Sequence, residues 1–202
     1  MKKFITLALA LCMALSASIC TSAAEIDTDG GSGSTPVYLS STEDGTMEGD
    51  PSATAMSVTV PTALPMAMSQ TGDVTTADNC QIINNSYGAV RVKSVTISAE
   101  NGWSLTAFGD KATLASEKVD SNQLGFAICI GDGEWAVTDN SNESAQALIS
   151  APINGCYMSG AGNAANNTVS VDYAAIVTPL STPVTNANIA NVVFVIEWDT
   201  AA

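Results

Sequence analysis

Apolar side chains recur at every second position along much of the chain after residue 55, the pattern of strands with one buried face. In residues 124–130 every even-numbered residue is Leu, Phe or Ile, and residues 169–177 alternate in the same way. Clusters rich in Gly, Asn and Pro separate the runs, and no long helical pattern interrupts them. The pattern predicts an all-β fold, a single antiparallel β-sandwich of Ig-like or Greek-key type with eight or nine strands, over residues 55–202.

Three local patterns refine this prediction. In the strand expected at 89–98, apolar residues lie at even positions up to Val92 and at odd positions from Val95, which predicts a β-bulge near Lys93 and Ser94. Asn101-Gly102 favours a hairpin between that strand and 103–108. The closing run, 192–198, is apolar on both faces through Ile196, which is typical of a central strand covered on both sides.

The first 24 residues follow a different pattern, that of a secretory signal peptide. Met1-Lys2-Lys3 precedes an apolar run of about 14 residues, and Ser22-Ala23-Ala24 supplies small residues for cleavage after Ala24. A retained signal anchor is the alternative, although a membrane span needs ~20 apolar residues. We expect export, and then a free extracellular protein or one held non-covalently at a cell surface.

Covalent retention is not expected. Lipoprotein processing needs a small residue before the cysteine, whereas Leu11 precedes Cys12 and Ile19 precedes Cys20. The chain contains no Leu-Pro-x-Thr-Gly sorting motif and ends in Trp198-Asp199-Thr200-Ala201-Ala202 without an apolar tail, so we expect no membrane span in the mature chain.

Residues 25–54 have the composition of a disordered acidic arm or linker. They hold seven acidic residues, no basic residue and many Gly, Ser and Thr, so they bury too little apolar surface to fold alone. One apolar island, Val37-Tyr38-Leu39, interrupts the segment. It could add as a strand to this molecule or to a neighbouring copy, which would give self-association through the arm.

Charge and composition exclude several function classes. From residue 25 on, four basic residues face 20 acidic ones, a formal charge of −16, so the chain repels polyphosphate and nucleic-acid binding is not expected. Histidine is absent, which rules out Ser-His-Asp and Cys-His catalysis within this chain. We therefore expect a protein that is not an enzyme and that needs no cofactor, with calcium as the one ion to consider.

The calcium hypothesis rests on one dense group of oxygen ligands. Calcium binds six to eight oxygens from flexible loops. The candidate ligands are Asp132, Glu134, Asp139, Asn140, Asn142 and Glu143. The alternative is a solvated turn, because the glycine and the spaced glutamate of an EF-hand loop are missing.

Aromatic and cysteine side chains give two further candidates. Trp135 lies two residues beyond the predicted turn Gly131-Asp132-Gly133, and Tyr157 lies in a predicted loop. Both could stack on a sugar ring, or else cap the ends of the core. Cys80, Cys129 and Cys156 allow at most one disulfide within the mature chain, and Cys129–Cys156 is the pairing we favour because each lies beside a loop. Alternatively, all three are small buried hydrophobic residues.

Three stretches together resemble a family of secreted proteins. They are Val58-Thr59-Val60-Pro61-Thr62-Ala63-Leu64-Pro65, then Ile82-Ile83-Asn84-Asn85-Ser86 with Asn101-Gly102-Trp103-Ser104-Leu105, and last Val193-Phe194-Val195-Ile196-Glu197-Trp198-Asp199. The order resembles uncharacterised surface proteins of Gram-positive, particularly clostridial, bacteria. More distantly it is similar to WxL-type cell-surface domains, which are β-rich and attach non-covalently to the cell wall.

The match to the WxL pattern is incomplete. Trp103-Ser104-Leu105 fits the first Trp-x-Leu motif, but Thr200 stands where the second motif has Leu. The resemblance implies a non-catalytic structural or adhesion protein whose partner is a cell-wall glycan or another surface protein. A glycan-binding module that uses the loop aromatics, with or without calcium, is the alternative function.

Overall fold

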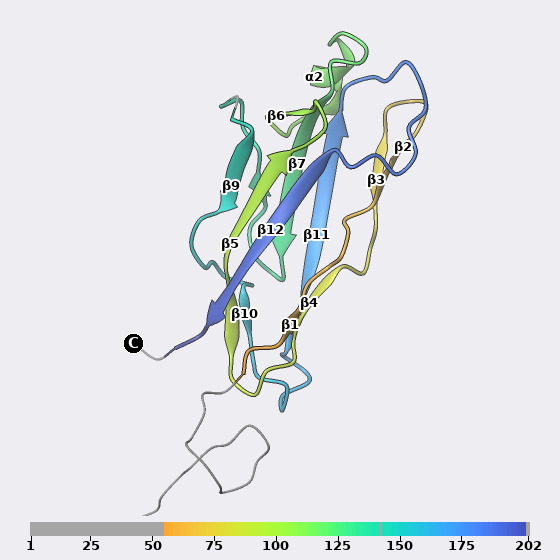
Figure 1. The fold of residues 1–202 in the computed structure, drawn as a ribbon. Helices are drawn as coiled ribbons and strands as arrows, with labels where there is room; N and C mark the ends of the chain where they lie inside the picture. Colours follow the sequence, from red (N-terminus) through yellow and green to blue (C-terminus); the bar gives the residue numbers. More distant parts are fainter. Residues whose placement is uncertain (1–54, 142, 201–202) are drawn as a thin grey trace, which may run out of the picture. The chain divides into compact units, whose positions relative to one another are not determined.

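The computed structural model describes residues 55–141 and 143–200, which belong to one compact unit (Figure 1). The predicted signal peptide, 1–24, and the predicted arm, 25–54, lie outside the described residues. The described strands are β1 (Val58–Thr59), β2 (Met66–Met68), β3 (Val74–Thr76), β4 (Gln81–Asn84), β5 (Val90–Ala99), β6 (Ser104–Thr106), β7 (Gln123–Ile130), β8 (Ala136–Val137), β9 (Ala145–Ile149), β10 (Tyr157–Met158), β11 (Thr168–Val177) and β12 (Ala190–Trp198). One short helix, α2 (Lys111–Ala115), begins at Asp110, whose carboxylate accepts a hydrogen bond from the Ala112 N–H.

The strands form two main sheets and a hairpin. The first sheet has the order β1-β4-β11-β7-β6, with β8 also paired to β7, and the second has the order β10-β5-β12, with β9 also paired to β5. β2 and β3 form the hairpin. All pairs are antiparallel except β6 with β7.

The core lies between the two sheets, and the residues predicted to face it do so. The even-numbered residues of β7 from Leu124 to Ile130 are at most 4% exposed, and they share one hydrophobic cluster with the inner residues of β5 and β11. The predicted all-β sandwich is therefore confirmed. The number of strands is 12 rather than eight or nine, because short segments such as β3 and β10 pair as well.

The bulge is confirmed, and the hairpin is wrong. Ser94 pairs with Val195 and Val92 pairs with Ile196, which leaves Lys93 as the extra residue of β5. Asn101 and Gly102 do make a turn, with φ of 50° and 82°. However, β6 then crosses to the first sheet and pairs in parallel with β7, where Leu105 is buried in the core.

The prediction for the closing strand is also corrected. Among the described residues β12 pairs with β5 alone and is the last strand of the second sheet, so it is an edge strand rather than a central one. Val193 and Val195 on its outer face are 53% and 42% exposed. An alternating burial pattern runs along most of the strand, with the even-numbered residues half-buried toward the core.

A membrane span was not expected in the mature chain, and within residues 55–141 and 143–200 no helix combines the length and the apolar character needed to cross a bilayer.

Candidate functional site

The first candidate site is a shallow groove beside the turn between β7 and β8. The turn is held together by the Gly133 N–H, which donates to the Ile130 carbonyl at 3.0 Å, and it packs directly against the backbone of Gly155. Trp135 follows the turn and is 53% exposed. The groove has a volume of about 340 Å³, and its lining residues are Glu134, Trp135, Ala136, Leu148, Ile149, Ser150, Ala151 and Ile153.

This groove has the chemistry of a sugar site. The exposed indole and the aliphatic wall offer apolar contact to the CH face of a pyranose, and Glu134 and Ser150 offer hydrogen-bonding groups beside it. Tyr157 was predicted to act with Trp135, but it lies on β10 opposite Arg91 and does not line the groove. It is 48% exposed, so the structure places both aromatics at the surface and only Trp135 at a groove.

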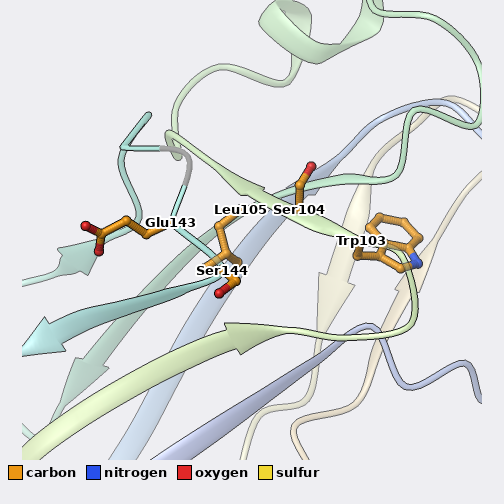
Figure 2. Close-up of a pocket in the computed structure, with 5 residues that line it drawn as sticks. All are labelled: Trp103, Ser104, Leu105, Glu143 and Ser144. Atoms are coloured by element: carbon orange, nitrogen blue, oxygen red, sulfur yellow. The ribbon is translucent and has the colours of Figure 1, made fainter.

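A second, smaller hollow of about 200 Å³ surrounds the Trp-x-Leu motif (Figure 2). It is lined by Trp103, Ser104, Leu105, Glu143 and Ser144. Leu105 is 4% exposed and belongs to the core, and the half-buried Trp103 packs against the same core. In Figure 2 the carboxylate of Glu143 points away from the indole of Trp103. The motif therefore contributes mainly to packing in this domain.

The structure does not bring the predicted calcium ligands together. Within the described part of the chain, no three carboxylates or thiols lie close enough to hold a metal ion, and Asn142 lies outside it. Asp132 and Glu134 lie in the turn before β8, whereas Asp139, Asn140 and Glu143 follow β8.

Local hydrogen bonds already occupy oxygens of Asp139 and Asn140 in the second group. The Asn140 Oδ1 accepts from the Thr106 hydroxyl and the Ala107 N–H, both at 2.9 Å. The Asp139 carboxylate accepts a hydrogen bond from the Ser141 N–H at 2.9 Å. Hydrogen bonds from the side chain and the backbone of Ser141 lower the pKa of Asp139. These oxygens shape the loop after β8.

The predicted Cys129–Cys156 disulfide is wrong in this structure, because both cysteines are free thiols. Cys129 occupies an odd-numbered position of β7 and therefore projects from the face opposite the core residues, where its thiol contacts the Gly133 carbonyl at 3.2 Å. Cys156 is fully buried in the core. Burial raises the pKa of both thiols, so both act as small buried side chains. Cys80 is a free cysteine as well and is half-buried.

The remaining candidate is the free edge of β12, which the sequence reasoning missed. Ile189 accepts from the Glu100 N–H at 2.9 Å and the Asp199 N–H donates to Ala89 at 3.0 Å, so the odd-numbered residues of this strand face β5. The even-numbered residues from Ala190 to Trp198 therefore direct their N–H and C=O groups to the other edge, where no strand of the described residues pairs. The apolar pattern on both faces of 192–196 was the signal that could have identified it.

Charged residues beside this edge are already paired with one another. On the outer face, Glu197 lies 2.8 Å from Arg91 and 3.1 Å from Lys93, and Arg91 also lies 3.4 Å from Asp199. Lys93 and Arg91 lower the pKa of Glu197 through these hydrogen bonds. Because the two bases neutralise Glu197 and the adjacent Asp199 locally, this end of the edge carries less repulsion than the net charge of the chain suggests.

Comparison of the chain with protein-family models, with curated proteins and with solved structures found no match in any of the three.

Proposed function

We propose that this chain is an exported, non-catalytic structural or adhesion protein that stays at or near a cell surface by pairing its β12 edge with a strand from a partner. The pattern of residues 1–24 supports export. The observation that carries the proposal is the nine-residue edge strand with two exposed valines and one open row of backbone groups.

An edge of this kind favours strand pairing. Exposed edges in soluble proteins usually carry proline, inward-pointing charges or bulges that prevent unwanted pairing. β12 contains no proline, its single carboxylate, Glu197, is paired with bases, and the extra residue of the bulge belongs to β5. Main-chain hydrogen bonds along the free edge would supply affinity, and the flanking side chains would supply specificity.

Replacing Val193 and Val195 by lysine should release the protein from the cell surface. Two charges on the outer face of the edge oppose strand addition, and both side chains already reach solvent, so the fold itself should change in stability by less than about 0.5 kcal/mol. The measurement compares the amount of the protein in the cell-wall fraction with the amount in the medium. We expect the wild type mainly with the cells and the double variant mainly in the medium.

The control variant replaces the same type of residue, at similar exposure, and adds the same charge. Val119 and Val184 are 54% and 56% exposed and lie outside every strand, so replacing both by lysine should leave surface retention unchanged. Equal release of both double variants, or retention of both, would contradict a role for β12.

Glycan binding at the Trp135 groove is the second candidate function. The specific observation in its favour is that Trp135, which follows the turn between β7 and β8, is half exposed and lines a groove with aliphatic and hydroxyl neighbours. Here the protein would hold a cell-wall or host polysaccharide rather than a strand.

Replacing Trp135 by alanine should weaken glycan binding about tenfold or more, since loss of a stacked aromatic costs upward of 1.4 kcal/mol. The measurement is a glycan array followed by titration calorimetry on any hit, with calcium and with a chelator. Tyr87, which is 89% exposed, is the control position for alanine. A blank array with calcium present would remove this function.

A further inference from the structure

We propose that the strand that pairs with β12 is the uncharged segment 34–42 of a second copy of this chain, added antiparallel, so that copies join head to tail. The inference rests on the proposed use of the β12 edge and identifies its partner.

The first step is that the core is incomplete at this edge. The inner residues of β5, Val90, Val92, Val95 and Ile97, are all 0% exposed. The inner residues of the neighbouring β12, among them Val192, Phe194 and Ile196, touch the same core but are only half-buried. Burial therefore decreases from β5 to the adjacent β12. One added strand would cover the inner side chains of β12 and the outer Val193 and Val195 as well. This also explains why the sequence of β12 has the pattern of a central strand.

The second step is the segment itself. Residues 25–54 hold seven acids, but none lies between Asp29 and Glu43. Within that gap, residues 34–42 read Ser-Thr-Pro-Val-Tyr-Leu-Ser-Ser-Thr, nine residues that match the nine of β12. Ser, Thr, Val and Tyr suit an added strand, and the lack of charge lets the segment approach an acidic protein.

Pro36 fixes the orientation of this segment. Proline has no N–H, so in an added strand its position must point away from β12. The neighbouring Val37 and Leu39 then direct their N–H and C=O groups toward β12. In an antiparallel pair, residues that exchange hydrogen bonds share a face, so these two residues lie on the same face as Phe194 and Ile196, which is the core side. A parallel arrangement would turn both of them to solvent, which is why antiparallel addition is favoured.

The third step concerns which copy supplies the segment. In antiparallel addition residue 42 lies beside the Ala190 end of β12. The described chain enters at the opposite end: Ser57 accepts from the Asn85 N–H at 2.8 Å, and the nearby Gly88 packs against Trp198. If the segment paired with β12 of its own chain, residues 43–54 would have to return along the whole length of the strand, roughly 30 Å. These residues include four acids and no base. A second copy has no such constraint.

In this proposal each copy gives one segment and receives another, so the contact is heterologous and joins copies into a linear chain where the rotation between them does not close a ring. Both partners are acidic, so their net charges repel. Added salt screens that repulsion and should lengthen the chains rather than dissolve them.

The experiment uses the chain from Glu25 to Ala202 and two variants with separate defects. Replacing Val37 and Leu39 by aspartate damages the donated segment, and replacing Val193 and Val195 by lysine damages the edge. In sedimentation velocity the wild type should form chains that grow with protein and salt concentration, and each variant alone should stay monomeric. An equal mixture of the two variants should stop at dimers, because one intact edge then meets one intact segment.

The control replaces Ile26 and Met47 by aspartate, which adds the same charge to the arm outside the segment and should leave the chains intact. A monomeric wild type at high salt would overturn the proposal, as would chains that survive the Val37 and Leu39 changes. If those changes spare cell-surface retention while the lysine variant loses it, β12 still has the proposed function but its partner is not this segment.

Discussion

Alanine at position 155 should lower the free energy of unfolding by about 3 kcal/mol or more. Gly155 has φ of +89°, a conformation that costs an L-residue roughly 1–2 kcal/mol. An added Cβ would also lie 2.2 Å from the Ile130 carbonyl oxygen and 2.7 Å from the Gly133 nitrogen, and both are backbone atoms that cannot rotate away. The backbone of the β7–β8 turn would have to shift, and the Trp135 groove with it.

Urea unfolding followed by circular dichroism measures this change. Gly162→Ala is the matched control, because Gly162 lies in a loop, has no positive φ and has no atom within 4 Å of an added Cβ. We expect the control to stay within about 0.5 kcal/mol of the wild type. Similar midpoints for both variants would show that the turn and the 152–156 loop are not packed as tightly as the structure has them.

The strands that were predicted best are those with one fully buried face. The even-numbered residues of 124–130 and the alternating residues of 169–177 became β7 and β11, since a two-residue period reports directly which face is buried. The bulge near Lys93 was found for the same reason, because a bulge reverses that period. Strands of two or three residues, such as β10, are too short to show a period.

Pairing partners could not be read in this way. Asn101 and Gly102 gave the turn correctly, but the partner of β6 depends on where Leu105 finds the core, and that is a contact distant in sequence. For β12 the apolar residues on both faces predicted a central, covered strand, whereas the structure places the strand at an edge with Val193 and Val195 exposed. The apolar residues of β12 therefore did not report which strands lie beside it.

The same distinction between local patterns and contacts distant in sequence applies to the candidate sites. For Trp135, which follows a Gly-rich turn, the sequence left two alternatives open, an exposed aromatic or a cap on the end of the core, and the structure shows the side chain half exposed. The calcium ligands were chosen for their density along the chain, but density does not show that the oxygens of Asp139 and Asn140 already accept hydrogen bonds from their own loop and from β6. The cysteine pairing failed because spacing does not reveal that Cys129 and Cys156 project on different sides of the sheet.

Replacing Asn84 by alanine should lower the free energy of unfolding by about 3 kcal/mol. The side chain is fully buried, and its amide nitrogen donates to the carbonyls of Gly88 and Ser159, both at 2.9 Å. Its oxygen accepts from the N–H of Ser86, itself 2% exposed. Each backbone group left unpaired inside the protein costs about 1–3 kcal/mol, and water that enters the space left by the amide recovers part of that cost.

The adjacent Asn85 provides the control, because it is exposed and its amide bonds only the hydroxyl of Thr59 in the described residues. Asn85→Ala should stay within about 0.5 kcal/mol of the wild type in the same urea titration. Both residues are asparagines and they are adjacent in the chain. A large difference between the two variants in the free energy of unfolding is therefore due to the buried hydrogen bonds of Asn84 rather than to the turn. Because Gly88 packs against Trp198, the Asn84 variant should also speed hydrogen exchange at the last residues of β12. Unchanged exchange there would mean that this network holds the turn alone and does not support the end of the edge strand.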